Sequence, residues 1–391
     1  DGAKALGAAL EQNSSLTTLD VTQNDLGVKG GIALGRALEV NNALTRLNLS
    51  NNRIGFGLER AGGFARSLVV NTSLTWLDMS QNELGALGGE AFAAALRVNT
   101  TLEELQLQRN GLGKVGGVAL GRSVGVNSGL TTLDVSQNDM GDEGAAAFGD
   151  ALACSSSLAS LNLARNGVGV EGGRALFVGL SGSTALDSLN VTRNDLGPGG
   201  GMALANALAA NTSLTRLHAA HNGLAESGAA LACSVELSNR MTTLDLSSNL
   251  FGAAEGTALC AAVSSHRSLV DVDLSSNAIT ILPVEAQLRL AARRPAMRLD
   301  LSNNPLSSPP LGQRADADEL NEYLRALQAE SMSTRRIRLM VCGYGGVGKT
   351  TFCTAAVRPA EELAHFHGSL ARVDEWDAPT IASWARRLHT D

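Results

Sequence analysis

The sequence predicts an α/β solenoid, with a parallel sheet on its concave side and helices on its convex side, followed by the first part of a second α/β domain. A strand-like motif that recurs about every 28 residues, and a helix-like motif between its copies, predict the solenoid. A short apolar run that leads into a glycine-rich loop predicts the second domain.

Composition and charge narrow the classes of protein to which the chain can belong. Aromatic residues make up 3% of the chain, hydrophobic residues 44%, and there are 43 glycines, which favours thin, closely packed layers over one globular core. The formal net charge of −7 gives no electrostatic surface for nucleic acid or an anionic membrane. No stretch approaches the roughly 18 apolar residues of a membrane helix, so neither nucleic acid nor membrane is expected as a partner.

The strand-like motif reads LxxLxLxxNxLG and first occurs over residues 16–27. Leu19 and Val21 alternate with polar residues, which predicts a strand whose apolar side faces the core. An asparagine side chain carries donors and an acceptor, so it can satisfy backbone groups where the chain turns off the strand, and stacked copies would form a ladder. The asparagine recurs at Asn24, Asn52, Asn82, Asn110, Asn138, Asn166, Asn194, Asn222, Asn249, Asn277 and Asn304.

Between these copies, the pattern Gly30-Gly-Ile-Ala-Leu-Gly-Arg-Ala-Leu38 places apolar pairs on one face of a helix. One strand–turn–helix unit cannot bury its faces alone, whereas eleven stacked units can. The pattern resembles the ribonuclease-inhibitor class of leucine-rich repeats over residues 1–312, in about 11 repeats. This resemblance implies a horseshoe-shaped binding scaffold.

The variable strand positions are expected to face the concavity. The position between the last two apolar residues is occupied by Asp20, Asn48, Asp78, Gln106, Asp134, Asn162, Asn190, His218, Asp245, Asp273 and Asp300. The position before each motif asparagine carries Arg109, Arg165 and Arg193 in the middle repeats. An acidic stripe is therefore predicted beside a weaker basic one.

Two interpretations of this face stay open: it binds a protein partner that carries a basic strip, or it is a solvated polar sheet. The candidate partner-binding residues are Asp20, Trp76, Asp78, Arg109, Asp134, Arg165, Arg193, Asp245 and Asp273. Trp76 is a candidate aromatic anchor, or it packs on the rim. His218 and His221 are expected to be surface residues and not metal ligands, since no other ligand accompanies them.

A linker is predicted over residues 313–334. Pro305, Pro309 and Pro310 end the solenoid, because proline cannot continue a strand or helix interior. Residues 314–332 then carry Leu320, Tyr323, Leu324 and Leu327 on one helical face. We expect this helix to cover the open end of the last repeat.

Residues 335–391 are predicted to be the N-terminal part of a nucleotide-binding domain. A buried parallel strand is expected over 337–342, a phosphate-binding loop over 343–350, since GYGGVGKT matches GxxxxGK[ST], and a helix over 351–357. Lys349 is expected to contact the β and γ phosphates, and Thr350 to bind Mg²⁺. The predicted nucleotide-binding set is Gly343, Gly345, Gly346, Val347, Gly348, Lys349, Thr350 and Thr351.

The order of repeats, linker and phosphate loop resembles the Roco family, in which a Ras-like Roc domain follows leucine-rich repeats. This resemblance implies a cytoplasmic regulatory protein that binds GTP or GDP with Mg²⁺, hydrolyses GTP slowly and forms a homodimer. The loop is also similar to that of ATP-dependent STAND or NB-ARC switches, and a third alternative is a non-catalytic interaction scaffold. No DxxG or NKxD element follows, so residues 1–391 alone are expected to be inactive.

Four smaller expectations complete the prediction. The segment from about residue 374, with Trp376 and Trp384, resembles the start of a SAM domain, or is an amphipathic helix with two core tryptophans. The Asn-x-Ser/Thr sequons are expected to be unmodified inside a cell; they begin at Asn13, Asn48, Asn71, Asn99, Asn190 and Asn211. The cysteines show no CxxC pair, so they are interpreted as small buried residues of a reducing compartment; they are Cys154, Cys233, Cys260, Cys342 and Cys353. Because the chain begins inside a helical pattern without Met, we interpret it as a fragment.

Overall fold

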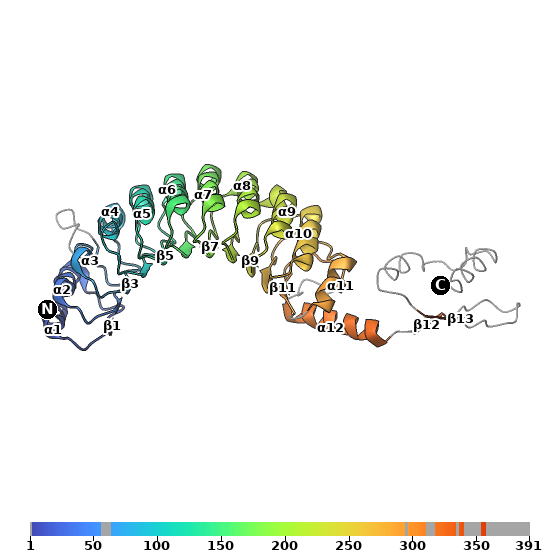
Figure 1. Cartoon of the computed structure of the whole chain (residues 1–391), viewed down its shortest axis with the longest axis horizontal. Helices are drawn as coiled ribbons and strands as arrows, with labels where there is room; N and C mark the ends of the chain where they lie inside the picture. Colours follow the sequence, from blue (N-terminus) through green and yellow to red (C-terminus); the bar gives the residue numbers. More distant parts are fainter. Residues whose placement is uncertain are drawn as a thin grey trace, which may run out of the picture.

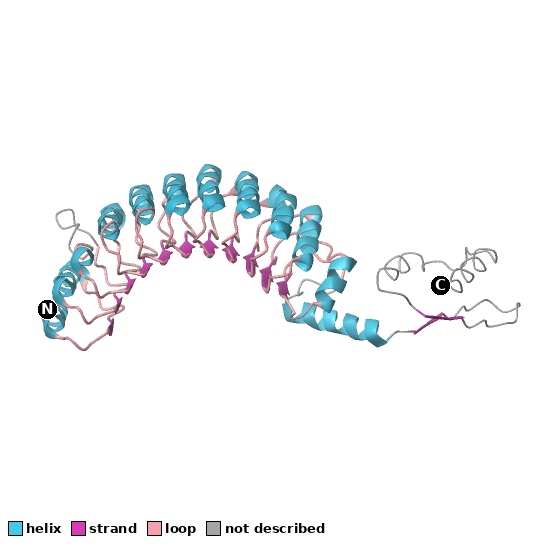
Figure 2. Ribbon diagram, viewed as in Figure 1, coloured by secondary structure: helices cyan, strands magenta, loops and turns pink. Residues whose placement is uncertain are grey.

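A computed structural model describes residues 2–55, 64–293, 296–309, 317–333, 336–339 and 353–356. The repeats form a curved solenoid (Figure 1), with strands along the concave edge and helices along the convex edge (Figure 2). Within the described residues, eleven strands make one sheet in the order β1 to β11, and every neighbouring pair is parallel. The predicted solenoid with its parallel sheet is confirmed.

Each strand is three residues long, with the motif leucine or valine at its centre. The strands are β1 (Thr18–Asp20), β2 (Arg46–Asn48), β3 (Trp76–Asp78), β4 (Glu104–Gln106), β5 (Thr132–Asp134), β6 (Ser160–Asn162), β7 (Ser188–Asn190), β8 (Arg216–His218), β9 (Thr243–Asp245), β10 (Asp271–Asp273) and β11 (Arg298–Asp300). The register is the same throughout, so equivalent positions of successive repeats lie directly beside one another, as Leu133 beside Leu161.

One helix precedes the first strand, and another follows each strand. They are α1 (Gly2–Gln12), α2 (Gly27–Val40), α3 (Ser67–Val70), α4 (Gly85–Leu96), α5 (Gly113–Val124), α6 (Gly141–Cys154), α7 (Val170–Gly182), α8 (Gly197–Ala210), α9 (Gly228–Leu237, after the 3-10 turn Ala225–Ser227), α10 (Ala253–Ser265), α11 (Val284–Ala292) and α12 (Ala317–Ser333). Glycine lets helices approach closely: a Cβ at Gly179 of α7 would overlap the backbone of Gly149 in α6.

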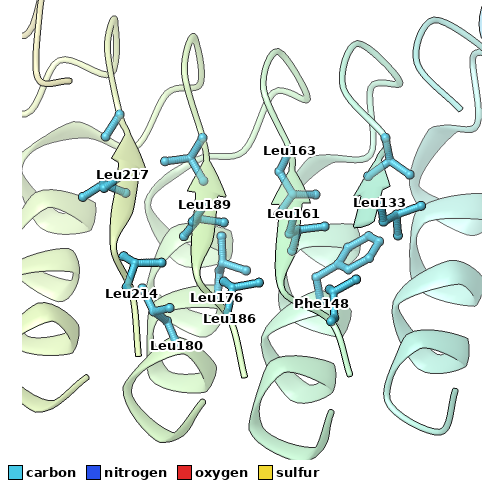
Figure 3. Close-up of a cluster of buried hydrophobic side chains, with 14 of the residues drawn as sticks. Leu133, Phe148, Leu161, Leu163, Leu176, Leu180, Leu186, Leu189, Leu214 and Leu217 are labelled. Atoms are coloured by element: carbon cyan, nitrogen blue, oxygen red, sulfur yellow. The ribbon is translucent and has the colours of Figure 1, made fainter. Parts of the chain in front are cut away.

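The core is a continuous layer between strands and helices. The strand-centre leucines lie above leucines and phenylalanines contributed by the helices, as Leu161 and Phe148 show (Figure 3). Both side chains are at most 1% exposed. Because each repeat contributes the same few positions, the layer extends from repeat to repeat.

The predicted ladder of motif asparagines is confirmed, and Asn138 shows how it works. Its side-chain oxygen accepts hydrogen bonds from the backbone of the preceding repeat, from Asn110 N at 2.9 Å and Leu112 N at 3.3 Å. Its amide nitrogen donates to Leu107 O of that repeat and to Val135 O of its own. The side chain is fully buried, so backbone groups that would otherwise be left without partners are satisfied.

A second ladder, which sequence analysis missed, runs where each helix ends. Asn127 donates to Leu96 O and Asn99 O of the preceding repeats, and accepts from Gly129 N and Leu130 N. We call this set the helix-end ladder; it comprises Asn13, Asn41, Asn71, Asn99, Asn127, Ser155, Ser183, Asn211, Ser238, His266 and Arg293.

The helix-end ladder gives three of the sequons a structural role. Asn71, Asn99 and Asn211 are at most 9% exposed, and the amide nitrogen of each donates to two backbone carbonyls. An amide held in this way is not available for a covalent attachment in the folded protein.

The predicted helix after the last repeat is confirmed as α12, and it covers the end of the solenoid. Leu320 and Leu324 are buried against α11 and β11, and Tyr323 donates from its hydroxyl to Gln287 Oε1 at 3.0 Å. A helix that covers the last repeat protects its apolar side from water.

Beyond α12, the structure differs from the prediction. Strand β12 (Arg336–Leu339) is present as expected, but its partner is β13 (Cys353–Ala356), and the two are antiparallel. The helix predicted over 351–357 is therefore wrong at the four described residues. Cysteine and threonine are weak helix formers, and an antiparallel partner satisfies the backbone of β12. The predicted phosphate loop and the segment from about 374 lie outside the described residues.

Candidate functional site

Each strand presents its first and third side chains to the concave face, while the central one is buried in β2 to β11 and partly buried in β1. The third position is aspartate or asparagine in nine of the eleven strands, and in all nine its Oδ1 accepts a hydrogen bond from the backbone N–H two residues later. Asp134 and Ser136 N, 2.8 Å apart, are typical. This turn explains why the position prefers aspartate or asparagine, a structural role that sequence reasoning missed.

Either residue can make the turn, so the choice of the charged one is informative. On β1 and β5, the aspartate is followed on the next strand by an asparagine whose amide donates a hydrogen bond to it. Asn48 Nδ2 donates to Asp20 Oδ2 at 3.2 Å, and Asn162 Nδ2 donates to Asp134 Oδ2 at 2.8 Å. No asparagine lies between Asp245, Asp273 and Asp300, on the adjacent strands β9, β10 and β11.

These three aspartates line a hollow of about 140 Å³ on the concave face, together with Asp271, His218 and Arg298. We call Asp245, Asp271, Asp273 and Asp300 the acidic surface. Adjacent strands are only about 4.8 Å apart, so the carboxylates repel one another. A basic side chain lies beside each of two of the aspartates: His218 Nδ1 is 3.8 Å from Asp245 Oδ2, and the Arg298 guanidinium is 3.6 Å from Asp271 Oδ1.

The electrostatics of the acidic surface follow from this arrangement. Burial, and then the charges of Asp245 and Asp300, raise the pKa of Asp273 above its usual range. Burial also acts to raise the pKa of Asp245, but hydrogen bonds from His218 and Ser247 outweigh it, so that this pKa is lowered. The centre of the surface therefore carries a charge that the fold itself disfavours.

The predicted anchor Trp76 lies on β3, far along the sheet from the acidic surface. Its ring is half-buried, and the guanidinium carbon of Arg46 on β2 lies 4.4 Å from the ring centroid. This cation–π contact covers part of the ring. Trp76 is therefore neither fully exposed nor buried on the rim.

The predicted basic stripe is exposed and occupies the turn after each strand. Arg109, Arg165 and Arg193 have φ of 56°, 55° and 58°, in the left-handed region, and so does every residue that precedes a motif asparagine. Left-handed backbone is unusual outside glycine, and nothing in the sequence signalled it. Arg109 Nε donates to Gln137 Oε1 at 2.7 Å. Within the described residues, no ion pair joins these arginines to the aspartates.

The structure does not gather the nine predicted partner-binding residues into one site. They extend from Asp20 on β1 to Asp273 on β10. It brings together Asp245 and Asp273, and adds Asp300, Asp271 and His218. Asp245, Asp273 and Asp300 occupy the same motif position in three consecutive repeats. Because the register is fixed, this sequence pattern could have predicted that they lie side by side. The eight predicted nucleotide-binding residues, among them Lys349 and Thr350, lie outside the described residues.

Other predicted features have mixed outcomes. Cys260 is buried, and burial raises the pKa of its thiol to about 12, whereas Cys154 and Cys233 are exposed, so the prediction of buried cysteines is wrong for those two. Their positions on outward faces of α6 and α9 explain the difference. In the part of the chain that the structure describes, no group of three or more His, Cys, Asp or Glu is arranged to hold a metal ion. No helix among the same residues is long and apolar enough to cross a membrane.

Comparison with known proteins agrees with the fold. The family model described as Leucine Rich repeat matches seven segments of the chain: residues 12–35, 40–55, 70–93, 98–121, 126–149, 154–177 and 182–205. These seven segments are thus similar to leucine-rich repeats. No curated protein matches the chain by sequence.

Several solved structures are similar. The leucine-rich repeat-containing protein LegL7 from Legionella pneumophila is 20% identical with a TM-score of 0.48, and the match covers 80% of this chain and 98% of that one. An internalin from Listeria monocytogenes is 18% identical with a TM-score of 0.46, covering 80% and 91%. TLR13, in complex with ssRNA13, is 18% identical with a TM-score of 0.48, covering 77% of this chain and 38% of that chain. At these levels the similarities carry no argument about function.

Proposed function

We propose that the horseshoe is a protein-interaction scaffold whose concave face binds a partner through the acidic surface, and that the partner contributes a basic strip. Support comes from the leucine-rich repeats and from the hollow in the sheet. A curved sheet presents many side chains to one ligand, which suits an extended protein surface.

The observation that carries the proposal is the run of three aspartates without an intervening asparagine. Asparagine makes the same turn bond elsewhere in this sheet, as at Asn162 and Asn190. Asparagine at position 273 would keep that bond and remove the repulsion from its neighbours. The charge is therefore not needed for folding, and a cationic partner would turn an unfavourable charge into a favourable one.

The experiment selects peptides from a random display library on residues 1–391 and measures their binding to two matched variants. Asp245→Asn, Asp273→Asn and Asp300→Asn together remove three charges from the acidic surface. Asp20→Asn, Asp78→Asn and Asp134→Asn remove three from the same strand position elsewhere. We expect enrichment of Arg- and Lys-containing peptides that bind the first variant at least about tenfold more weakly, a loss of about 1.4 kcal/mol, and the second variant unchanged. Equal binding to both variants would refute the proposal.

A second proposal concerns the nucleotide. We propose that Lys349 and Thr350 bind a nucleoside triphosphate with Mg²⁺ in a regulatory switch of Roco type, with GTP as the leading nucleotide and ATP as the alternative. The loop sequence GYGGVGKT supports it. The strand at Cys353–Ala356 is an observation against it, because this loop normally leads into a helix.

The test of the nucleotide proposal uses the intact protein. Fluorescent GTP should bind and be displaced by GTP more readily than by ATP, and Lys349→Ala should weaken binding strongly because the β and γ phosphates lose their cation. Preference for ATP would favour a STAND-type switch. No nucleotide binding, or binding that Lys349→Ala leaves intact, would leave the scaffold as the function.

A further inference from the structure

A second hollow lies on the flank of the solenoid, away from the concave sheet, where α10 and α11 end. It has a volume of about 410 Å³, within the range of small-molecule sites. Its apolar wall consists of Leu269, Val270, Ala292 and Ala296. Its polar lining consists of Ser264, Ser265, His266, Arg267, Arg289 and Arg293. Three arginines thus line one cavity, and no aspartate or glutamate is among the described residues that line it.

Arg293 is held in place by the backbone. Its guanidinium donates to Arg267 O at 3.2 Å and to Leu269 O, and burial lowers its pKa. Arg267 and Arg289 are exposed, and neither forms an ion pair with a described residue. One arginine therefore forms a fixed wall, while the other two are free to close on a ligand.

The repeat itself provides a control for this site. At the position of Arg293, the preceding repeats carry asparagine, serine or histidine. At the position of Arg267 they carry Ser14, Asn42, Thr72, Thr100, Ser128, Ser156, Thr184, Thr212 and Asn239. At the position of Arg289 they carry Ala37, Ser67, Ala95, Ser123, Ala151, Gly179, Ala207, Ser234 and Ala262. Three independent positions change to arginine around the same cavity.

Helix geometry does not account for this change. Cations near a helix C-terminus are favourable, and α5 carries Arg122 in its last turn, but α2, α3, α4, α6, α7, α8, α9 and α10 have no basic residue there. The solenoid therefore does not need arginine at its helix ends. Like charges gathered in a partly enclosed cavity repel, and a bound anion would relieve that repulsion.

We propose that this cavity binds a phosphate monoester carried on a small apolar group. Arg267 and Arg289 contact the phosphate oxygens from two sides, since the guanidinium fork matches phosphate geometry. Arg293 supplies a fixed positive potential, and the apolar wall receives the organic part of the ligand. The two ring nitrogens of His266 are already used, because Nε2 donates to Ser238 O and Nδ1 accepts from Leu269 N at 3.1 Å. His266 therefore lines the cavity without contacting the phosphate through a ring nitrogen.

The test measures binding of phenyl phosphate and inorganic phosphate to residues 1–391 by calorimetry. Phenyl phosphate should bind at least about tenfold more tightly, because its ring buries against the apolar wall. The imidazole resonances of His266 should shift at the same time. Absence of phenyl phosphate binding, or equal affinity for the two ligands, would overturn the proposal.

The variants follow from the exposure of the two outer arginines. Arg267→Gln with Arg289→Gln should weaken phenyl phosphate at least tenfold while the melting temperature stays unchanged. The matched control is Arg97→Gln, an exposed arginine at the end of α4 that does not line this cavity. If the double variant binds as well as the control, the site is refuted.

A further binding measurement, with a phosphorylated peptide, identifies the source of the phosphate. A short phosphotyrosine peptide that binds more tightly than phenyl phosphate indicates a phosphorylated protein, whereas equal affinity indicates a free metabolite. Both results support the cavity as a site for phosphate monoesters. The acidic surface shares no lining residue with this cavity, so this test is independent of the scaffold proposal.

Discussion

The middle repeats and the C-terminal repeats share a fold but differ in how closely they follow the repeat pattern. In the middle, Asp134 receives the amide of Asn162, and Asn127 occupies the helix-end ladder. Towards the C-terminus, aspartate follows aspartate on the sheet, and histidine and arginine replace asparagine at the helix ends. Since the regular residues satisfy the backbone equally well, the irregular ones call for another explanation. Both proposed binding sites lie among them.

The largest change in stability is expected in the middle repeats, which follow the repeat pattern closely. Asn138→Ala should lower the free energy of unfolding by about 3–5 kcal/mol, because buried backbone groups of two repeats lose their partners. Urea denaturation measures this. Asn24→Ala is the control: the Asn24 side chain is exposed and donates only within its own turn, to Val21 O and Thr22 O, so about 1 kcal/mol or less is expected. Similar losses for the two variants would contradict the role given to the ladder.

Restoring asparagine at an irregular position of the helix-end ladder should raise the free energy of unfolding, by a smaller amount than Asn138→Ala lowers it. Ser155 is buried but reaches only Leu158 N, at 3.2 Å, whereas asparagine at this position in other repeats also donates to the preceding repeat. Ser155→Asn should therefore stabilise the protein by about 0.5–1.5 kcal/mol. Thermal unfolding measures the gain, with exposed Ser156→Asn as control. A loss of stability would show that the irregular ladder residue is required by its surroundings.

The charge of the acidic surface should lower the stability of the folded protein. The pKa of Asp273 is raised in the folded state, so ionisation costs stability as pH rises through its titration, and neutralising the side chain removes that cost. Asp273→Asn should stabilise the protein at pH 7 by about 0.2–1 kcal/mol, the range for like charges opposed across strands. Asp134→Asn should bring no gain, because Asn162 loses its charged acceptor. Equal changes in stability for Asp273→Asn and Asp134→Asn would contradict the proposed difference between the acidic surface and the middle repeats.

The smallest effect at neutral pH is expected for His266→Asn, which restores the regular ladder residue. Burial lowers the pKa of His266, so the unfolded chain takes up this proton at a higher pH than the folded protein does. Stability from this group is complete above the unfolded pKa of about 6.5 and is lost as the pH falls below it. The variant should lose less stability than the natural protein between pH 7 and pH 5, as urea midpoints would show. His221→Asn, at an exposed position, is the control.

Much of the fold could be predicted from the sequence because the repeat is encoded locally. The eleven asparagines, the alternating strand residues and the capping helix with Leu320 and Leu324 were all placed correctly. The helix-end ladder was missed because its residue type varies along the chain, from asparagine at Asn127 to serine, histidine and arginine in other repeats. The helix expected over 351–357 was wrong at β13, where an antiparallel partner decided the local conformation.

The candidate sites were less predictable than the fold. Asp245 and Asp273 were recognised, but the sequence could not show that the other predicted residues are spread over the whole sheet. The cavity between α10 and α11 was missed entirely, since Arg267, Arg289 and Arg293 belong to different elements and none matches a motif. Exposure of Cys154 and Cys233 likewise depends on helix rotation and not on residue type.

The sequence by itself determined the strand–helix repeat of the solenoid, because spacing and periodicity specify which side chains each unit must bury. Only the tertiary structure decided which charges lie together. The common register places Asp245, Asp273 and Asp300 side by side, and the ends of α10 and α11 bring three arginines to one cavity. Burial is encoded repeat by repeat, whereas charge proximity arises only when the repeats are stacked.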